Sequence, residues 1–334
     1  MNKINREIKS VVITGPTGSI GHALCSRLLR EGIVVYAVVR PESKRSTSLP
    51  TGVTIIECDI SNYTVLASKI GHADSFVHLA WANTFGGGRN DMPSQIANIQ
   101  YSIDAVSVAR ELGCRIFIGA GSQAEYGRVS TALSPDTPCF PENGYGMAKL
   151  CAGEMTRVEC EKYGIEHIWF RILSIYGPYD NPNSLISYAV RSFQNGEKPS
   201  LTKCEQMWDY LYSGDAADAF YLALKHGRSG SIYTLGSGIC RPLNEYIKTI
   251  RDIINSSAEI GFGDKSYPDK QVMYLNADTT DLREDTGWYP LVSFDNGIKE
   301  TVTYMKNAPQ IIGGGVILYD VCIYLSQSVW RYAA

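Results

Sequence analysis

A tyrosine and a lysine spaced for proton transfer stand near the middle of the chain, at Tyr145 and Lys149. Residues four apart on a helix lie on one face, about one turn from each other, so the two side chains would be neighbours. A nearby ammonium favours the phenolate and lowers the pKa of a tyrosine, which is normally about 10. The tyrosine could then exchange a proton with an alcohol or a carbonyl near neutral pH. Ser122, at the end of the preceding expected strand, would supply a hydroxyl that holds the reacting oxygen.

A glycine-rich turn near the N-terminus predicts a phosphate-binding loop. Residues 8–13 form an apolar run typical of a buried strand, residues 14–21 contain the glycines, and a helical pattern then runs to a stop at Gly32. In such a turn one glycine permits the bend, a second lets the backbone approach a pyrophosphate, and a third lets the helix pack closely. These are Gly15, Gly18 and Gly21. The alternative is a turn that binds nothing.

Strand and helix patterns alternate through the first half of the chain. The expected strands are 34–39, 53–58, 74–79, 115–120 and 167–172, and the expected helices between them are 95–112 and 145–163. This alternation predicts a parallel, doubly wound α/β sheet.

The composition changes to turn residues after about residue 174. Further helices are expected near 185–195, 215–225, 243–254 and 294–306, with a short strand at 231–235. We therefore expect a dinucleotide-binding domain over 1–173 and a smaller α/β substrate lobe mainly over 174–310, with some segments returning to the sheet. The apolar and aromatic tail at 311–334 would be a docked segment, a dimer contact or an aberrant C-terminus.

The residues after the strand at 34–39 favour a phosphorylated dinucleotide. This position lies at the adenosine ribose of a doubly wound fold, where an acidic side chain binds the 2′-hydroxyl and repels a 2′-phosphate. The chain has cations and a serine here instead, namely Arg40, Ser43, Lys44 and Arg45. They favour NADP over NAD, with a solvated basic loop as the alternative. Asp59-Ile60, after the next expected strand, would lie on the adenine side.

Composition and charge exclude several classes of protein. The 334 residues carry a formal net charge of −3, which gives no field to attract nucleic acid or a membrane surface. The nine cysteines are scattered, without a CxxC pair or a Cys/His cluster at metal-ligand spacing, so neither a metal site nor a disulfide framework is expected. The first residues lack the apolar core of a secretion signal. A cytoplasmic protein is therefore expected.

Taken in order, these motifs resemble the extended short-chain dehydrogenase/reductase superfamily, in its branch of nucleotide-sugar epimerases, dehydratases and reductases. The resemblance covers about residues 8–306. Besides the glycine loop, it is carried by Asp59-Ile60, His78-Leu79-Ala80, Asn98, Ser122 with Glu125-Tyr126-Gly127, Tyr145-x-x-x-Lys149, Tyr176-Gly177-Pro178, Asp209-Tyr210-Leu211-Tyr212 with Asp215, and Asp278 followed by Gly287-Trp288 and Pro290.

The resemblance implies a Rossmann-type fold and a role for each matching residue. Tyr145 would be the proton donor or acceptor, Lys149 would tune it and bind the nicotinamide ribose, and Ser122 would hydrogen-bond the sugar oxygen. The residues expected to bind the dinucleotide are Gly15, Thr17, Gly18, Ser19, Ile20, Gly21, Arg40, Ser43, Lys44, Asp59, Ile60, Leu79, Ala80, Tyr145 and Lys149. A homodimer through a four-helix bundle of the helices at 95–112 and 145–163 is also implied.

Five residues are candidates for contact with a nucleotide-sugar substrate: Trp81, Gln123, Tyr126, Ser174 and Trp208. Core packing is the alternative for Trp81 and Tyr126. Ser174 stands where many epimerases carry an asparagine, and Trp208 stands where they carry an arginine that would meet the substrate diphosphate. Four cations elsewhere could compensate, or could be exposed surface charges: Lys198, Lys203, Arg241 and Lys270.

A second departure from the family pattern narrows the range of reactions that the enzyme could catalyse. Sugar 4,6-dehydratases carry two carboxylic acids directly after the position of Ser122, and these acids perform the elimination. This chain has Gln123 and Ala124 there, and neither side chain transfers protons at neutral pH. Glu125 comes one position too late. A dehydratase is therefore disfavoured.

Three functional hypotheses follow. The first is an NADP-preferring oxidoreductase that reduces a 4-keto group of a nucleotide-linked deoxysugar, with Tyr145 as the proton donor. The second is a 4-epimerase that uses the same residues and retains its NAD. The third is a non-catalytic dinucleotide-binding scaffold or redox sensor, against which the intact Ser122, Tyr145 and Lys149 argue.

Overall fold

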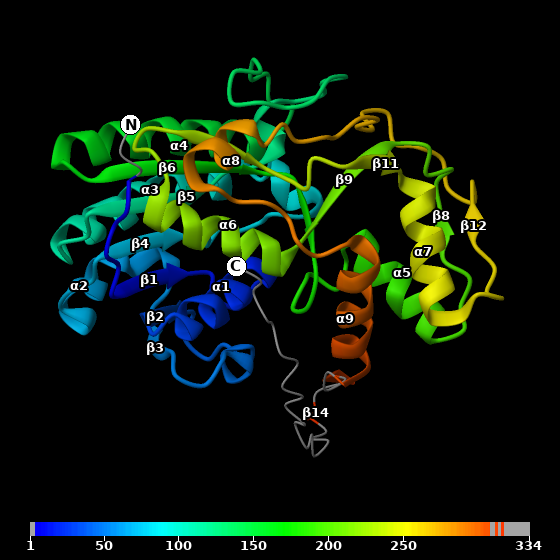
Figure 1. Ribbon diagram of the computed structural model, residues 1–334, viewed down its shortest axis with the longest axis horizontal. Helices are drawn as coiled ribbons and strands as arrows, with labels where there is room; N and C mark the ends of the chain where they lie inside the picture. The colour runs from blue at the N-terminus through cyan, green and yellow to red at the C-terminus, as the bar shows by residue number, and fades with distance from the viewer. Residues whose placement is uncertain (1–3, 308–310, 313–314, 317–334) are drawn as a thin grey trace, which may run out of the picture.

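Seven parallel strands form the centre of the larger lobe (Figure 1), in the order β10-β6-β5-β4-β1-β2-β3. The computed structural model describes residues 4–307, 311–312 and 315–316. The strands are β1 (Ser10–Thr14), β2 (Val34–Val39), β3 (Thr54–Glu57), β4 (Ser75–His78), β5 (Ile116–Ala120), β6 (Glu166–Ile172) and β10 (Ile232–Leu235). The strand order reverses between β1 and β4, the place at which doubly wound sheets bind ligands.

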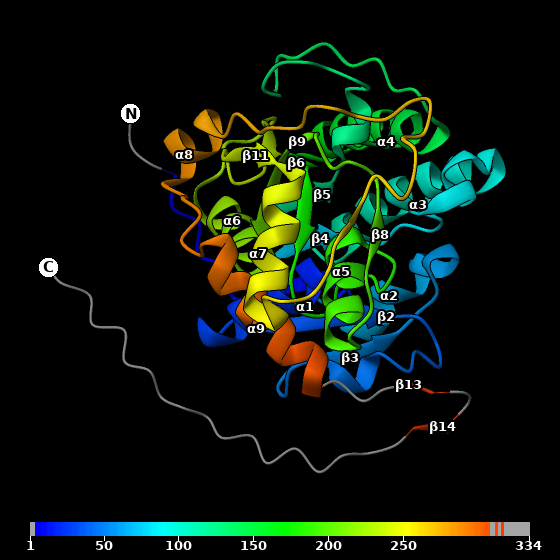
Figure 2. The same cartoon turned by 90° about the vertical axis from the view of Figure 1, so that its right-hand side faces the viewer.

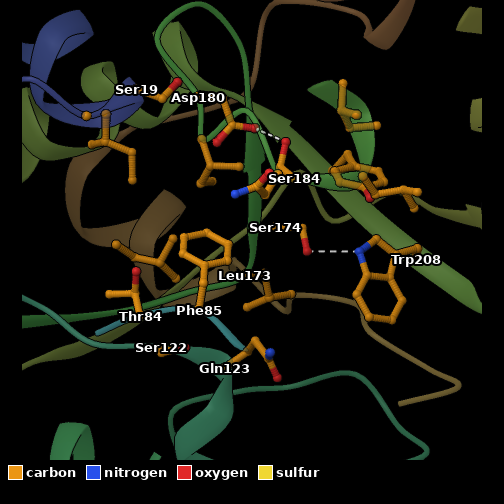
Figure 3. A pocket seen from close by; sticks show the side chains of 18 of the residues that line it. Ser19, Thr84, Phe85, Ser122, Gln123, Leu173, Ser174, Asp180, Ser184 and Trp208 are labelled. Atoms are coloured by element: carbon orange, nitrogen blue, oxygen red, sulfur yellow. Dashed lines mark hydrogen bonds between the residues drawn. The ribbon is translucent and has the colours of Figure 1, made fainter. Parts of the chain in front are cut away.

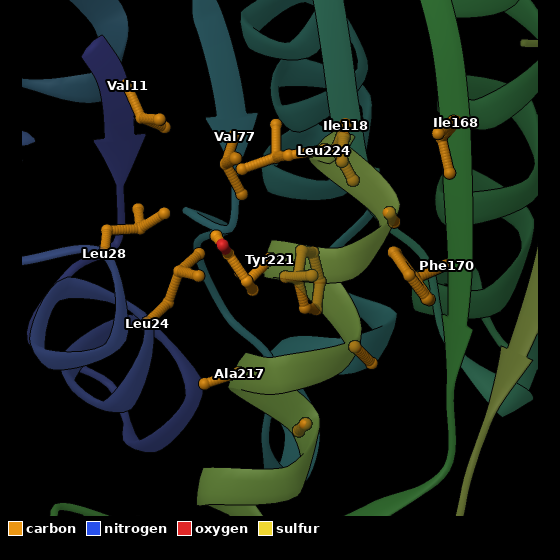
Figure 4. Close-up of a cluster of buried hydrophobic side chains, with 14 of the residues drawn as sticks. Val11, Leu24, Leu28, Val77, Ile118, Ile168, Phe170, Ala217, Tyr221 and Leu224 are labelled. Carbon is orange, nitrogen blue, oxygen red and sulfur yellow. The ribbon is translucent and has the colours of Figure 1, made fainter. Parts of the chain in front are cut away.

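Helices cover both faces of this sheet. One face is covered by α1 (Ser19–Arg30) and α6 (Ser213–His226), and the other by α2 (Leu66–Ile70), α3 (Met92–Glu111) and α4 (Gly144–Tyr163). Figure 4 shows Leu24 and Leu28 of α1 beside Val11 of β1, with Tyr221 of α6 in the same cluster. Because both faces are buried, the central strands are almost wholly apolar.

The smaller lobe is built from three helices and several short strands (Figure 2). The helices are α5 (Leu185–Gln194), α7 (Leu243–Asn255) and α9 (Phe294–Asn307), while α8 (Thr280–Thr286) packs beside α6. One sheet has the order β11-β9-β7 and another pairs β12 with β8. These strands are β7 (Ser174–Tyr176), β8 (Ser200–Leu201), β9 (Met207–Tyr212), β11 (Cys240–Pro242) and β12 (Gly261–Phe262). Tyr176, Tyr246 and Phe294 meet in the core of this lobe.

The α/β class and the parallel sheet predicted from the sequence are confirmed. The second predicted strand matches β2 to the residue, and the predicted helix at 145–163 matches α4 to within one residue. β10 and α6 lie with the larger lobe although they follow residue 174. The division into three parts stays a prediction. The role expected of the tail at 311–334 falls outside the described residues, apart from the short strands β13 (Ile311–Ile312) and β14 (Gly315–Val316).

The described residues contain neither a membrane-crossing helix nor a cluster of metal ligands. No helix among them is long and apolar enough to cross a membrane. No group of three or more histidine, cysteine, aspartate or glutamate side chains in that part of the chain could hold a metal ion.

Candidate active site

The predicted catalytic residues and the glycine loop line one cavity of about 770 Å³. The cavity begins at the carboxyl ends of β1, β4 and β5 and extends into the smaller lobe. From the larger lobe its lining includes Gly15, Gly18, Ser19, Ile20, Gly21, Leu79, Trp81, Ser122, Gln123, Tyr145 and Lys149. From the smaller lobe it includes Ser174, Asp180, Ser184, Tyr188, Trp208 and Lys265.

The glycine loop has the geometry of a phosphate cradle. Gly15 has a φ of +70°, and a Cβ there would lie 2.9 Å from the backbone nitrogen of Ala80. A Cβ on Gly21 would lie 2.7 Å from the Cα of Pro16, so α1 packs too closely for any side chain. A Cβ on Gly18 would meet no atom nearer than 3.7 Å and would occupy the cavity. Since α1 has no side-chain cap, its first N–H groups are available to an anion, which fits a dinucleotide pyrophosphate.

A buried hydrogen-bond chain fixes the end of β4. The hydroxyl of Thr14 accepts hydrogen bonds from the backbone N–H groups of Leu79 (3.2 Å) and Ala80 (3.3 Å) and lies 2.9 Å from Nδ1 of His78. The Nε2 atom of His78 lies 3.3 Å from the hydroxyl of Ser102. Burial lowers the pKa of His78 to about 3, so this histidine is neutral and structural.

The predicted adenosine side lies beyond the cavity lining. Arg40 and Lys44 are exposed and follow β2, and Asp59 begins a short 3-10 turn after β3. Hydrogen bonds from Ser61 hold the pKa of Asp59 below its ordinary value, and the charge of Arg40 acts in the same direction. Seven residues of the predicted dinucleotide set do not line the described cavity: Thr17, Arg40, Ser43, Lys44, Asp59, Ile60 and Ala80.

Ser122 is held by a capping box at the end of β5. Its hydroxyl accepts a hydrogen bond from the N–H of Ala124 (3.2 Å), and its own N–H donates to Oε1 of Glu125 (2.7 Å). The carboxylate of Glu125 is fully buried and also accepts hydrogen bonds from Trp169 (3.2 Å) and Arg171 (2.9 Å). Glu125 therefore points away from the cavity and stabilises the turn that presents Ser122.

Tyr145 stands in the first turn of α4, which begins after Asn143. The side chain of Asn143 caps the helix by accepting the N–H of Gly146 (2.9 Å). The ring of Tyr145 lies edge-on to Trp81, with 6.1 Å between centroids, and the guanidinium carbon of Arg89 lies 4.6 Å from its centroid. Burial raises the pKa of Tyr145, while the hydroxyl of Ser122 and the charge of Arg89 act in the opposite direction.

Lys149 is buried on the same helix as Tyr145, one turn further along. Its Nζ donates to the carbonyl oxygen of Ala120 (2.6 Å) and lies 3.7 Å from the centroid of the Trp81 ring. The Nζ is 5.9 Å from the ring centroid of Tyr145. Burial lowers the pKa of Lys149 from 10.5 to about 7. The side chain nevertheless lines the cavity, within the region where a nicotinamide ribose is expected.

Two departures from the family pattern form a hydrogen-bonded pair in the smaller lobe. The indole N–H of Trp208 donates to the hydroxyl of Ser174 (2.8 Å), and both side chains face the cavity with Gln123 (Figure 3). β7 and β9 are parallel neighbours, which brings the two residues together. The wall at this point is therefore neutral.

The structure places Tyr126 away from the cavity, contrary to its expected contact with substrate. The side chain is 1% exposed, packs with Leu133 and Leu173, and donates its hydroxyl to the carbonyl oxygen of Ser134 (2.8 Å). Tyr126 is therefore a core residue, which was the alternative considered from the sequence. None of the four cations considered as compensation lines the described cavity, since Lys198 pairs with Asp264 and Arg241 stacks on Tyr246.

Several lining residues were not predicted from the sequence. Thr84, Phe85 and Arg89 come from the glycine-rich segment after β4, and Asp180 and Lys265 come from the smaller lobe. Phe85 is an exposed aromatic side chain next to three glycines, and this pattern could have indicated that the segment contributes to a site. Burial raises the pKa of Asp180, whose carboxylate accepts a hydrogen bond from Ser184 (2.7 Å).

The sequence pattern of the NAD dependent epimerase/dehydratase family matches residues 11–236. The chain belongs to this family. The resemblance recognised from the sequence is therefore confirmed, and the protein is an NAD-dependent enzyme of the short-chain dehydrogenase/reductase type. The hypothesis of a non-catalytic scaffold is set aside.

Three relatives share about a quarter of their residues with this chain. CDP-abequose synthase of Salmonella muenchen is 25% identical over 307 residues, which cover 88% of this chain and 97% of that protein. dTDP-4-dehydro-6-deoxyglucose reductase of Escherichia coli is 25% identical over 311 residues, which cover 89% of this chain and 97% of that protein. The structure of UDP-glucose 4-epimerase from Thermotoga maritima superposes with a TM-score of 0.80 at 23% identity, covering 89% of this chain and 98% of that one. The similarity to the Thermotoga maritima structure shows a shared fold alone.

Proposed function

We propose that this enzyme reduces a 4-keto group on a nucleotide-linked deoxysugar and prefers NADPH to NADH. The observation that carries the proposal is the chemistry around Ser122 and Tyr145. Both groups face one cavity, while the neighbouring positions that would supply acids for an elimination hold Gln123 and Ala124. Glu125 is committed to Arg171 and does not reach the cavity. The site therefore has groups for proton transfer to one oxygen and lacks, in the described lining next to them, a second acid–base pair.

Each residue has a defined part in the reduction. A bound nicotinamide supplies the hydride. The hydroxyl of Ser122 hydrogen-bonds the keto oxygen and polarises the carbonyl, and Tyr145 then donates its phenolic proton to that oxygen. Lys149 binds the cofactor ribose, and the carbonyl oxygen of Ala120 holds its ammonium in place.

The choice of substrate class rests on the relatives and on the size and lining of the cavity. The two similar proteins in Salmonella and Escherichia coli are named for a CDP-linked and a dTDP-linked sugar. A volume of about 770 Å³ is within the range of small-molecule sites. At the far end Lys265 lies over the ring of Tyr188, 5.5 Å from its centroid, and could meet a diphosphate.

The preference for NADPH rests on the end of β2. Arg40 and Lys44 are exposed there, and among the described residues neither forms an ion pair. They would therefore be available to a 2′-phosphate.

A 4-epimerase remains the second candidate, because contacts across the cofactor site suit a retained dinucleotide. The hydroxyl of Ser19 donates to the carbonyl oxygen of Pro178 (2.8 Å), and Arg45 donates to that of Tyr179 (2.7 Å). The ring of Tyr179 stacks on His22 with 3.6 Å between centroids. These contacts join the glycine loop and the β2 loop to the smaller lobe, which would slow exchange of the cofactor.

A homodimer through α3 and α4 is also proposed. The two helices pack side by side and expose apolar side chains to solvent, including Ile96 (66% exposed) and Val158 (54%). Pairing with the same helices of a second copy would bury these side chains in a four-helix bundle. Cytoplasmic location stays a prediction.

Two measurements test the function. The purified protein is denatured, and any released dinucleotide is identified by mass and quantified by absorbance. Near-stoichiometric NAD would contradict the reductase and favour the epimerase. Little bound cofactor, with NADPH binding more tightly than NADH, would support the reductase.

The substrate is then sought among nucleotide-linked 4-keto sugars. Tyr145→Phe should reduce turnover by about two to four orders of magnitude, the usual contribution of a general acid. Unchanged turnover would contradict the role of Tyr145.

A further inference from the structure

The loop between β7 and α5 runs from the smaller lobe to the two places where a doubly wound fold holds its dinucleotide. We call this loop, residues 177–184, the strap. The hydroxyl of Ser19, at the start of α1, donates to the carbonyl oxygen of Pro178 (2.8 Å). The guanidinium of Arg45, in the loop after β2, donates to the carbonyl oxygen of Tyr179 (2.7 Å). Because α1 begins at the pyrophosphate and β2 ends at the adenosine ribose, the strap spans the dinucleotide site.

The ring of Tyr179 contacts both lobes. It stacks on His22 of α1, with 3.6 Å between centroids and 18° between the ring planes, and lies 4.5 Å from the ring centroid of Tyr304 on α9. His22 is itself held, because its Nε2 lies 2.8 Å from the carbonyl oxygen of Ser48. An aromatic pair stabilises a contact beyond the area that it buries. The stack on His22 therefore fixes the strap against α1.

The backbone of Tyr179 is held in a conformation that it would leave if these contacts were released. Its φ is +62°, in the left-handed region that residues other than glycine rarely adopt. A residue remains in that region only where its surroundings hold it there. Gly177, at the start of the strap, has a φ of +148° and the conformational freedom of a residue without Cβ. A pivot at Gly177 would let the strap lift and the strain at Tyr179 relax.

The rest of the strap is held together by its own hydrogen bonds. The carboxylate of Asp180 accepts from the hydroxyl of Ser184 (2.7 Å) and from the N–H of Asn181 (2.6 Å). The side-chain oxygen of Asn181 accepts the N–H of Asn183 (2.8 Å). Asp180, Asn183 and Ser184 line the cavity, and Figure 3 shows Asp180 and Ser184 at the same end of it as Ser19. The strap would therefore move as one unit and open the cavity wall as it moves.

We propose that the strap is a gate for dinucleotide exchange and that Tyr179 keeps it shut. Its contacts to α1 and to the loop after β2 would have to break before a dinucleotide could enter or leave. This inference rests on the proposed function only in the binding of a dinucleotide, which the reductase and the epimerase share. The two reactions differ in how often the gate opens, because a reductase exchanges its cofactor in each cycle and an epimerase retains it.

The test is Tyr179→Ala, which removes the ring and leaves the backbone carbonyl in place. Protein loaded with NADPH, or with NADH, is mixed with an excess of the oxidised dinucleotide, and the loss of bound nicotinamide fluorescence gives the release rate. Mixing free protein with increasing amounts of the reduced dinucleotide gives the association rate. Because a shut gate bars entry and exit alike, losing one aromatic pair should raise both rates about two- to tenfold. The Kd from calorimetry should stay close to the wild-type value.

Two further variants examine the stack itself. Tyr179→Phe keeps the ring and should keep the wild-type rates. His22→Ala removes the other half of the stack, so it should raise both rates as Tyr179→Ala does, and it provides the test if Tyr179→Ala does not fold. Combining the two alanine substitutions should add little to either one alone, because both remove the same contact.

Turnover reports separately on the proposed function. If cofactor release limits a reductase, kcat of Tyr179→Ala should rise with the release rate, whereas an epimerase should keep its wild-type kcat. If no nucleotide-linked sugar is turned over, the proposed function fails, and the release and association rates still decide the role of the strap.

The matched control is Tyr289→Ala. Tyr289 is 58% exposed, packs with Arg283 at 5.1 Å from its ring centroid, and lies outside the cavity. This variant should leave both rates unchanged. A faster release in Tyr179→Ala with an unchanged association rate would make Tyr179 a mere contact of the bound cofactor and would overturn the gate. Unchanged release would overturn it as well.

Discussion

Glu125 couples the stability of the fold to the position of the catalytic serine, and replacing it with alanine should damage both. The carboxylate is fully buried and accepts three hydrogen bonds, from the N–H of Ser122 (2.7 Å), the indole of Trp169 (3.2 Å) and the guanidinium of Arg171 (2.9 Å). The side chain of Arg171 is itself only 5% exposed. Removing the carboxylate therefore leaves a buried cation and a buried N–H group without their partner.

The size of the effect follows from these contacts. Breaking a buried ion pair by removing one partner costs about 3–5 kcal/mol in the free energy of unfolding. Glu125→Gln keeps the shape and one acceptor oxygen, so its loss should be smaller, about 1–3 kcal/mol. If the capping box positions Ser122, the turnover of Glu125→Ala should fall toward that of Ser122→Ala while its KM for cofactor stays unchanged, whereas Glu125→Gln, whose amide oxygen can complete the box, should stay nearer the wild type.

Urea-induced unfolding gives the free energies, and steady-state kinetics give the turnover. Glu142→Ala is the control, because Glu142 pairs with Arg128 at the surface, where an ion pair contributes little. A loss in Glu125→Ala no greater than in the control would refute the reasoning from burial. Wild-type turnover in a folded Glu125→Ala enzyme would refute the positioning of Ser122.

Two further predictions concern the cofactor side of the cavity. Gly21→Ala brings a methyl group against the backbone of the loop and should destabilise the protein by about 1–3 kcal/mol, whereas Gly18→Ala, which meets no close atom, should keep its stability and lose cofactor affinity in calorimetry. The reverse pattern would contradict the loop geometry. For Lys149, whose pKa falls from 10.5 to about 7 on folding, the unfolded state binds more protons between those values. The wild type should therefore gain stability relative to Lys149→Met, by up to about 1.4 kcal/mol per pH unit, as the pH rises above 7. A difference that stays flat with pH in urea titrations would show that the ammonium is not desolvated.

The large elements of the fold could be predicted because their patterns are bounded by strong local signals. β2 is an apolar run between the left-handed Gly32 and the charged Arg40, and α4 ends at Gly164, which has a φ of +69°. The two-residue strands β8 and β12 and the short helix α8 carry no periodic signal of their own. Such elements are set by tertiary packing, which the sequence alone does not display.

The motif residues of the site could be predicted because parallel strands bring their carboxyl ends to one edge. Gly15, Leu79 and Ser122 follow three neighbouring strands and meet in the cavity for this reason. Tyr126 does not line the cavity, because the turn after Ser122 directs successive side chains to different sides. The position of Arg89 in the cavity could not be predicted, because Arg89 belongs to no motif. Its position depends on the hydrogen bonds that anchor a glycine-rich loop.

The pairing of Ser174 with Trp208 shows why two departures from the family pattern belong together. A half-buried indole N–H needs an acceptor, and the hydroxyl of Ser174 supplies one at 2.8 Å across the β7–β9 pair. A longer asparagine at 174 would compete for the space that the indole occupies, and an alanine there would leave the N–H unsatisfied. The two positions therefore act as one neutral unit in the cavity wall. The positive charges of the described lining lie instead at Arg89, Lys149 and Lys265.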